Sequence, residues 1–278
     1  MNLRTTLAIA LASLMTACQQ IGTEDECGTK NMSFTVGFNV DKESISRGTI
    51  SDCFTTLQVF DYKDGVLANE ITQTSEDESF GTVMLDTEYG SHEYVFVGHS
   101  TEPCEYDYEN SELSFDKILD TFTAFQTLEI DIDTEESQTI KLERQVAGIK
   151  LIMLDAIPES AACIELTIEG YSSTLDPKTG KGKTGSKHTR EWTYADSNIG
   201  MKNTSYTLYT FIPDDGHTVT VTVTLKDAEE GIIVKHTLED ISVEKNTMTV
   251  ISGEFMSTGL TSTIEVESEW NDDIVVNL

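Results

Sequence analysis

The stretch NMSFTVGFNV, residues 31–40, alternates large apolar residues with small or polar ones. Successive side chains of a β-strand point to opposite faces, so a period of two indicates a strand with one buried face. The sequence therefore predicts a strand here that packs against a hydrophobic core. Its apolar positions are Met32, Phe34, Val36, Phe38 and Val40.

The same alternation occurs twice more, at 217–225 (HTVTVTVTL) and between Leu260 and Trp270. Segments that are apolar on both faces, or nearly so, are typical of inner strands. Turn signals rich in Gly, Asp and Pro separate the segments, at 63–65, 88–90, 176–182, 213–216 and 229–231. We therefore expect an all-β chain with the turn spacing of β-sandwiches. The inner segments are TTLQVFDY, EYVFVG, IKLIML, IELTIEG and SYTLYTFI.

One segment has a different period. In SFDKILDTF, residues 114–122, apolar residues fall at helical spacing behind a possible N-cap, Ser114. This pattern predicts one short helix in an otherwise β chain. A seam near Arg144 then divides the chain into two tandem β-sandwich domains, residues 31–144 and 145–278. The apolar helix positions are Phe115, Ile118, Leu119 and Phe122.

The N-terminal residues match an export signal: Arg4 is followed by an apolar segment, 7–15, that is too short to span a bilayer as a mature helix. The small residues before Cys18 resemble the lipobox of bacterial lipoproteins, in which the cysteine is acylated. The resemblance implies a lipoprotein signal peptide at 1–17 and an acylated polar tether at 18–30. Two or more acyl chains hold a protein stably on a membrane. An ordinary signal peptide with a chance cysteine is the alternative.

The charge balance limits the partners. The chain has 18 Lys and Arg against 49 Asp and Glu, a formal net charge of -31. Such a charge argues against nucleic acid or anionic lipid as the partner of the folded part. Membrane contact therefore has to come from the lipid at Cys18. Several of the few basic residues crowd one loop: Lys178, Lys181, Lys183, Lys187 and Arg190.

Four cysteines remain when Cys18 is set aside. In an oxidising compartment they can form two disulfides, with three pairings between which the sequence does not choose, and free or singly paired thiols are the alternative. None of their spacings matches a zinc site, and we expect neither a metal nor another cofactor. The four are Cys27, Cys53, Cys104 and Cys163.

The chain carries no complete catalytic motif. GKGKTG at 180–185 has Pro177 where a phosphate-binding loop needs its first glycine. The acidic segment 131–143 has Glu136 and Leu142 where a calcium loop needs glycine and glutamate. No HExxH or G-x-S-x-G occurs, so we do not expect an enzyme.

Three aromatic residues suggest an alternative function. Trp192, Tyr194 and Trp270 could stack on sugar rings, which would make the protein a surface glycan-binding lipoprotein. Aromatic residues of sandwiches more often pack in the core or at a sheet edge. The glycan-binding interpretation is therefore the second hypothesis.

Two segments resemble the paired signatures of the fimbrillin-like lipoproteins of Gram-negative anaerobes, the subunits of donor-strand (type V) pili. LQVFDYKDG at 57–65 is similar to the VFD-x-x-G strand and turn of the anchor-type subunits. LERQVAGIKLIMLDAIPES at 142–160 is similar to the L-x-R-x-V-A-x-I strand followed by Asp and Pro. The resemblance implies two transthyretin-like β-sandwich domains. It also implies a structural role, as an anchor, accessory or stalk subunit of an adhesive cell-surface fimbria.

In that family a strand from a neighbouring subunit fills the groove of an incomplete sandwich. The resemblance implies that the strand at 32–40 is the candidate exchanged strand and that an Arg-specific protease can cut between Arg47 and Gly48. Stalk subunits lose the lipid and this strand together, whereas anchor subunits keep both. The VFD-x-x-G segment favours the anchor or accessory type. The apolar segment IVVNL, residues 274–278, is either a donor strand or the last strand of its own sheet.

The expected partners follow from the same resemblance. They are other fimbrial subunits, the outer membrane through the lipid at Cys18, and a ligand on a host or bacterial surface. The acidic residues Glu24 to Glu26 are similar to the export signals that send such lipoproteins outward. We therefore expect a lipid-anchored protein of the outer membrane, exposed at the cell surface.

Overall fold

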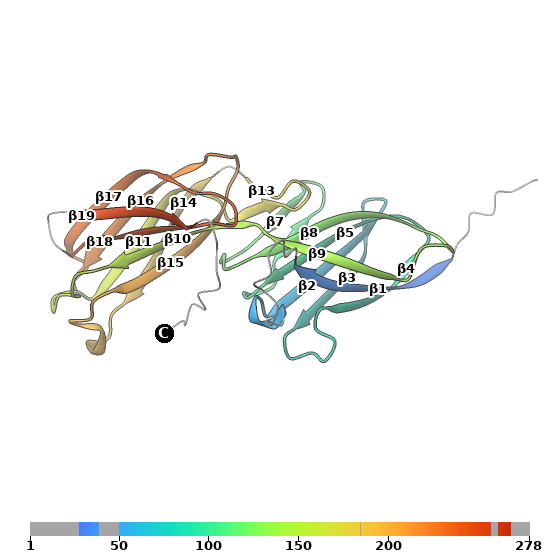
Figure 1. Cartoon of the computed structure of the whole chain (residues 1–278), viewed down its shortest axis with the longest axis horizontal. Helices are drawn as coiled ribbons and strands as arrows, with labels where there is room; N and C mark the ends of the chain where they lie inside the picture. The colour runs from blue at the N-terminus through green and yellow to red at the C-terminus, as the bar shows by residue number, and fades with distance from the viewer. Residues whose placement is uncertain (1–27, 39–49, 184, 257–260, 268–278) are drawn as a thin grey trace, which may run out of the picture.

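The computed structural model describes residues 28–38, 50–183, 185–256 and 261–267. Within these residues the protein is almost entirely β, and its helical elements are two 3-10 turns, η1 (Ile50–Asp52) and η2 (Asp196–Asn198). No helix among them is long and apolar enough to cross a membrane. The molecule is elongated, with β1 to β5, β8 and β9 towards one end and β10, β11 and β14 to β19 towards the other (Figure 1).

The first half forms one seven-stranded sheet, in the order β3-β2-β5-β8-β9-β1-β4. Strands β8 and β9 share only two residue pairs, so the sheet folds there into two facing layers. Inward side chains of both layers form one hydrophobic cluster. The strands are β1 (Thr29–Phe38), β2 (Thr56–Lys63), β3 (Val66–Thr74), β4 (Thr82–Glu88), β5 (Gly90–His99), β8 (Phe122–Ile130) and β9 (Ser137–Arg144).

The second half consists of two four-stranded sheets, β15-β10-β18-β19 and β14-β11-β16-β17. The alternation at 217–225 is confirmed, because the apolar row of β16 is buried. The strands are β10 (Val146–Met153), β11 (Cys163–Tyr171), β14 (Ser186–Thr193), β15 (Thr204–Phe211), β16 (Thr218–Lys226), β17 (Ile232–Ser242), β18 (Met248–Glu254) and β19 (Thr261–Glu267).

The two halves repeat one arrangement of strands. In the first half β1 lies between antiparallel β4 and parallel β9, and in the second half β10 lies between antiparallel β15 and parallel β18. The order β3-β2-β5-β8 likewise corresponds to β14-β11-β16-β17. The second half adds β19, which pairs antiparallel with β18.

Strands β2 and β5 are buried on both faces, as their apolar sequences predict. One face of each strand packs on the inward side chains of β1, β4 and β9. The other face carries Phe60, Tyr62, Val95 and Val97, which belong to the hydrophobic cluster that continues into the second half. This second buried face ties the two halves together.

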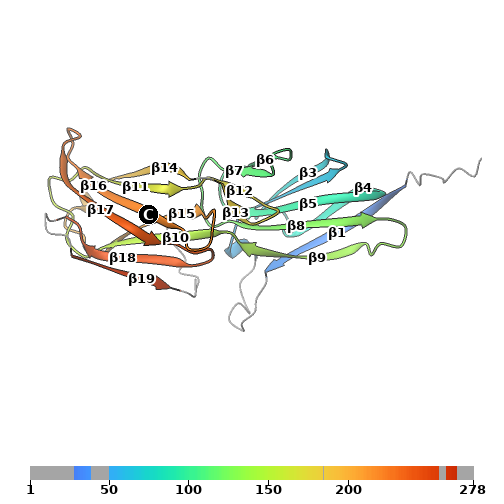
Figure 2. The same ribbon diagram turned by 90° about the horizontal axis from the view of Figure 1, so that it is seen from above.

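A small sheet joins the halves, in the order β13-β12-β7-β6 (Figure 2). Its strands are β6 (Glu105–Asp107), β7 (Glu112–Ser114), β12 (Thr174–Asp176) and β13 (Lys181–Gly182). The predicted lysine-rich turn at 176–182 is confirmed as the link between β12 and β13. We call the sheet the junction sheet.

The helix predicted at 114–122 is wrong. Ser114 ends β7, Phe122 begins β8, and the residues between them form bends without a regular element. Phe115 and Ile118 are buried as the helical spacing requires, but tertiary contacts hold the segment open. Phe115 packs on Phe211, and the carboxylate of Asp120 binds Arg144. Such contacts override weak local helix propensity.

Candidate functional site

Strand β1 is an inner strand of its sheet, with a partner on each side. It pairs with β4 from Thr29 to Thr35 and with β9 from Ser33 to Phe38. An inner strand that is lost leaves unpaired backbone groups on both neighbours, which can then template another strand. We call the space that β1 fills between β4 and β9 the β1 slot.

The inward side chains of β1 reach the centre of the first hydrophobic cluster. Met32 and Phe34 are 0% exposed and Val36 is 5% exposed. The ring centroid of Phe34 lies 4.9 Å from that of Tyr94 and 5.4 Å from that of Phe96. The predicted buried face is therefore confirmed for these three residues. The side chain of Phe38, and all of Val40, lie outside the described part of the chain.

The loop between β8 and β9 closes one end of the β1 slot. The backbone N–H of Ser33 donates to the carbonyl oxygen of Glu136 at 2.7 Å. The ammonium of Lys30 donates to the carbonyl oxygen of Ile132 at 2.8 Å and to that of Asp131 at 3.4 Å. The N-terminal part of β1 is thus held by contacts outside the two strand ladders.

A buried polar pair underlies the first family signature, and sequence reasoning did not identify it. Nδ1 of His92 lies 2.6 Å from Oδ1 of Asp61, and both side chains are fully buried. Nε2 of His92 lies 2.9 Å from the carbonyl oxygen of Glu88, and Asn69 donates to Oδ2 of Asp61 at 2.8 Å. The aspartate of VFD-x-x-G therefore links β2, β3 and β5. A carboxylate inside an otherwise apolar run was the signal for such a pair.

The glycine that ends this stretch, Gly65, stands one residue later than the spacing VFD-x-x-G requires, and it has a backbone role. Asp64 and Gly65, with φ of 52° and 78°, form the two-residue turn between β2 and β3. Asp-Gly is favoured in such hairpins because both central residues take positive φ. The stretch 57–65 thus encodes one member of a buried polar pair, followed by a tight turn.

Residues of the second signature fix the passage from β9 to β10. Arg144 contacts Asp120 through two nitrogens, at 2.8 and 3.0 Å, and donates to Asn246 of the second half at 3.1 Å. The carboxylate of Asp155 accepts hydrogen bonds from the backbone N–H groups of Phe255 and Met256, at 3.2 and 2.6 Å. Arg144 and Asp155 of this signature therefore both make structural contacts.

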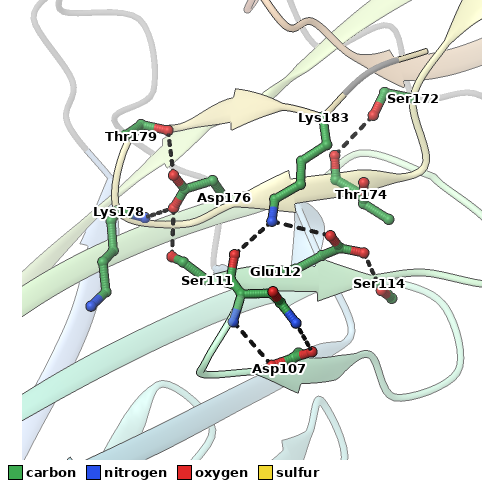
Figure 3. Close-up of polar contacts among 11 residues, drawn as sticks. Asp107, Ser111, Glu112, Ser114, Ser172, Thr174, Asp176, Lys178, Thr179 and Lys183 are labelled. Atoms are coloured by element: carbon green, nitrogen blue, oxygen red, sulfur yellow. Dashed lines mark hydrogen bonds and ion pairs between the residues drawn. The ribbon is translucent and has the colours of Figure 1, made fainter. Parts of the chain in front are cut away.

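Polar contacts across the junction sheet connect the halves (Figure 3). The carboxylate of Asp176 accepts hydrogen bonds from the hydroxyl of Ser111 at 2.7 Å and from that of Thr179 at 2.9 Å. The ammonium of Lys183 donates to the carbonyl oxygen of Asn110 at 2.6 Å and lies 3.1 Å from the carboxylate of Glu112. Burial raises the pKa of Asp176, but these and two backbone hydrogen bonds outweigh it and lower the pKa overall.

An aromatic group extends the junction over β5 and β8. The ammonium of Lys178 lies 5.1 Å from the ring centroids of both Tyr108 and Phe125, and 2.7 Å from the carboxylate of Glu93. The rings of Tyr108 and Tyr62 stack at 4.4 Å. Lys178 and Lys183 of the basic loop therefore contact the first half, whereas Lys181 lies 3.6 Å from the carboxylate of Asp214 in its own half.

Several predicted site residues lie outside the described part of the chain. They include the lipidation site, the candidate cleavage site, one member of the sugar platform and one cysteine: Cys18, Arg47, Gly48, Trp270 and Cys27. No group of three His, Cys, Asp or Glu side chains that could hold a metal ion is found among the described residues.

Two cysteines do not form disulfides. Cys104 and Cys163 are buried free thiols, so the arrangement with two disulfides is wrong and the alternative of free thiols holds for these two. Burial raises the pKa of Cys104 to about 12 and that of Cys163 to about 11. Both thiols therefore stay protonated near neutral pH.

Trp192 and Tyr194 are only half-buried and pack against the second hydrophobic cluster. The guanidinium of Arg190 lies 4.7 Å from the centre of the Trp192 ring, and the ring of Tyr206 lies 5.1 Å away, edge to face. The hydroxyl of Tyr206 donates to that of Tyr194 at 2.9 Å. These contacts make edge packing the simpler account of both residues.

Comparison with known proteins gives one family match and several structural ones. A family model described as "Family of unknown function (DUF6562)" matches residues 106–278. No curated protein sequence matches the chain.

Three solved structures similar to this chain come from species of Bacteroides and Parabacteroides. A "putative adhesin" from Bacteroides ovatus has a TM-score of 0.51 at 12% identity, over 82% of this chain and 88% of that chain. A "putative adhesin" from Bacteroides thetaiotaomicron has a TM-score of 0.51 at 13% identity, over 88% and 98%. A "fimbrial assembly protein" from Parabacteroides distasonis has a TM-score of 0.46 at 14% identity, over 86% and 98%. At these identities the first two likenesses show a shared fold.

Proposed function

The chain belongs to the family of unknown function whose model covers residues 106–278, and from this premise we propose that it is a non-enzymatic structural subunit of an adhesive cell-surface fimbria. The shared fold with proteins described as putative adhesins supports the proposal. Within the fimbria it serves as an anchor or accessory subunit. It associates with other subunits through β-strand donation.

The observation that carries the proposal is the position of β1. This strand is buried by its inward row, has a partner on each side, and is the first strand of the part of the chain that the structure describes. Only residues 39–49, which include Arg47, separate it from η1. A cut after Arg47 breaks the peptide chain between β1 and η1, so the strand can leave together with the N-terminal tether.

Departure of β1 creates a groove of a kind that accepts a strand from another protein. Strands β4 and β9 then present unpaired N–H and C=O groups, and the aromatic pocket of Phe34 lies open. Main-chain hydrogen bonds supply affinity in this mode of recognition, and pockets for alternate side chains supply specificity. Where β1 stays in place, the slot is closed and the subunit remains attached through the lipid at Cys18.

The mass and N-terminal sequence of the native protein test this proposal. We expect the outer-membrane fraction to contain chains that start at an acylated Cys18, as an anchor or accessory subunit requires. A start at Gly48 in sheared surface fibres would instead assign the stalk role. Absence of the protein from both fractions would refute a fimbrial role.

Two variants serve as controls. Cys18→Ser removes the acylation site, so we expect the protein to leave the membrane fraction. Arg47→Gln removes the candidate cleavage site and leaves the lipid, so any fragment that starts at Gly48 is expected to disappear. A fragment that persists in Arg47→Gln chains would show that Arg47 is not the cleavage site.

A further inference from the structure

We propose that the β1 slot selects its occupant by a basic side chain at the position of Lys30, so that the donor is a strand of a different subunit that carries Lys or Arg there. The inference rests on the proposed function, since it concerns the partner in strand donation. It adds a charge requirement to the apolar pattern that any strand of this slot must have.

Lys30 belongs to the inward row of β1. Lys30 falls on the same face of the strand as Met32 and Phe34, because side chains of a strand alternate. Its register partner on β4 is Thr87, which is 0% exposed. Lys30 therefore occupies the N-terminal end of the inward row, where the row leaves the core.

The Lys30 ammonium is bound by hydrogen-bond acceptors of the loop between β8 and β9. The nitrogen donates to the carbonyl oxygens of Ile132 and Asp131, and a carbonyl oxygen only accepts hydrogen bonds. The carboxylate of Asp131 belongs to the same loop, and its Oδ1 accepts from the N–H groups of Asp133 and Thr134, at 2.9 and 2.8 Å. A cationic side chain can donate hydrogen bonds to the carbonyl oxygens at this end of the slot. A carboxylate in the same place cannot donate, and the negative charge of the loop repels it.

The charge of the loop at the slot end supports the same choice. Four of the six residues from 131 to 136 are acidic, namely Asp131, Asp133, Glu135 and Glu136. Opposite charge at a recognition site raises specificity, and like charge excludes wrong partners. The slot therefore presents an acidic entrance followed by apolar pockets.

The apolar pockets of the slot determine which apolar residues the donor strand needs. The middle pocket holds the aromatic Phe34 between Tyr94 and Phe96, and the pockets on either side hold Met32 and Val36. The donor strand thus has a basic residue, then a large aliphatic, an aromatic and a branched residue at every second position. It runs parallel to β9, as β1 does.

The apolar segment near the C-terminus of this chain does not fit that description. Ile274, Val276 and Leu278 have the required alternation, but Asp272 falls where the slot holds Lys30. Entry of this segment in the orientation of β1 places a carboxylate against the carbonyl oxygens and the acidic loop. The slot therefore disfavours the C-terminal segment of a second copy as donor, which agrees with an anchor or accessory role.

Peptide exchange into the full-length protein tests the inference. A protease recognition sequence replaces residues 43–48, and cleavage under reducing conditions breaks the link between β1 and the rest of the protein. Fluorescent peptides of residues 28–38 then compete with β1, followed by anisotropy. Variants of the peptide are Lys30→Arg, Lys30→Glu and, as a control for added negative charge on the exposed face, Thr35→Glu. Peptides of residues 267–278, with and without Asp272→Lys, complete the set.

We expect the unchanged and Lys30→Arg peptides to bind alike, Thr35→Glu to bind within about threefold, and Lys30→Glu to bind at least tenfold more weakly, a difference of about 1.4 kcal/mol. Asp272→Lys is expected to strengthen the 267–278 peptide by a similar factor. Equal binding of the Lys30→Glu and unchanged peptides would overturn the charge requirement and leave strand donation standing. Failure of every 28–38 peptide to enter would overturn both proposals.

Discussion

The guanidinium of Arg144 meets the carboxylate of Asp120 at two points, with Nε 2.8 Å from Oδ1 and Nη2 3.0 Å from Oδ2. Arg144 ends β9 and Asp120 lies in the irregular segment before β8, so the pair joins two passages of the chain. The guanidinium also lies 5.0 Å from the ring centroid of Phe122. Planarity allows an arginine to make all of these contacts at once.

Arg144→Lys is therefore expected to destabilise the protein although it keeps the charge. A lysine cannot make the two-point contact or stack on Phe122, and loss of hydrogen bonds between charged groups costs about 1–3 kcal/mol. Urea denaturation measures the change in the free energy of unfolding. Lys141→Arg on the exposed face of the same strand is the control, with an expected change within about 0.5 kcal/mol. Equal effects at the two positions would contradict a specific role of the pair.

Phe34→Ala is expected to lower the free energy of unfolding by about 3–5 kcal/mol, because it leaves a cavity in a fully buried aromatic cluster. Thr35 is the matched control, since it lies next in the same strand and is exposed. We expect Thr35→Ala to change stability by less than about 1 kcal/mol. Similar losses at both positions would show that β1 is not held by its inward row.

The alternating stretch at 31–40 predicted the decisive part of the candidate site. Period two identifies the buried face directly, so Met32, Phe34 and Val36 could be assigned before the partners of β1 were known. The neighbours themselves could not be predicted. Strand β9 lies about a hundred residues away in the sequence, and its parallel pairing leaves no local signal.

The junction sheet could not be predicted from the sequence for a different reason. Its strands have two or three residues each, too few to establish a period, and β7 pairs with β12 some 60 residues further along the chain. The error at 114–122 has the same origin. Phe115, Ile118 and Phe122 are buried at helical spacing, but they pack on groups from both halves that no local pattern encodes.

Lys183→Met is expected to loosen the junction sheet without unfolding the halves. The change removes the ammonium that joins Asn110 and Glu112 to the second half. Amide hydrogen exchange should become faster in β7 and β12 and stay unchanged in β16. Lys187→Met is the control, because Lys187 makes a 3.6 Å ion pair with Glu169 in which both side chains are exposed. Unchanged exchange in β7 would show that Lys183 does not hold the junction.

The protein is expected to lose stability on mild acidification because of one buried imidazole. His99 is 0% exposed, with Nε2 2.8 Å from Oε1 of Gln58. Burial lowers its pKa from 6.5 to about 4, against a smaller opposing effect of a hydrogen bond with the Thr101 backbone. Between these values the unfolded chain binds the proton more tightly than the native protein does. Stability is therefore fully present above pH 6.5 and is lost as the pH falls towards 4.

A shift of this size corresponds to roughly 3 kcal/mol between pH 7 and pH 4. Denaturant titrations of the parent protein and of His99→Gln at both pH values measure the effect. The parent is expected to lose about that much more stability than the variant, because relief of repulsion among the acidic residues is common to both. His217→Gln, at a half-buried histidine on another strand end, should follow the parent. If His99→Gln and the parent lose the same amount, the imidazole of His99 is not the group that couples stability to pH.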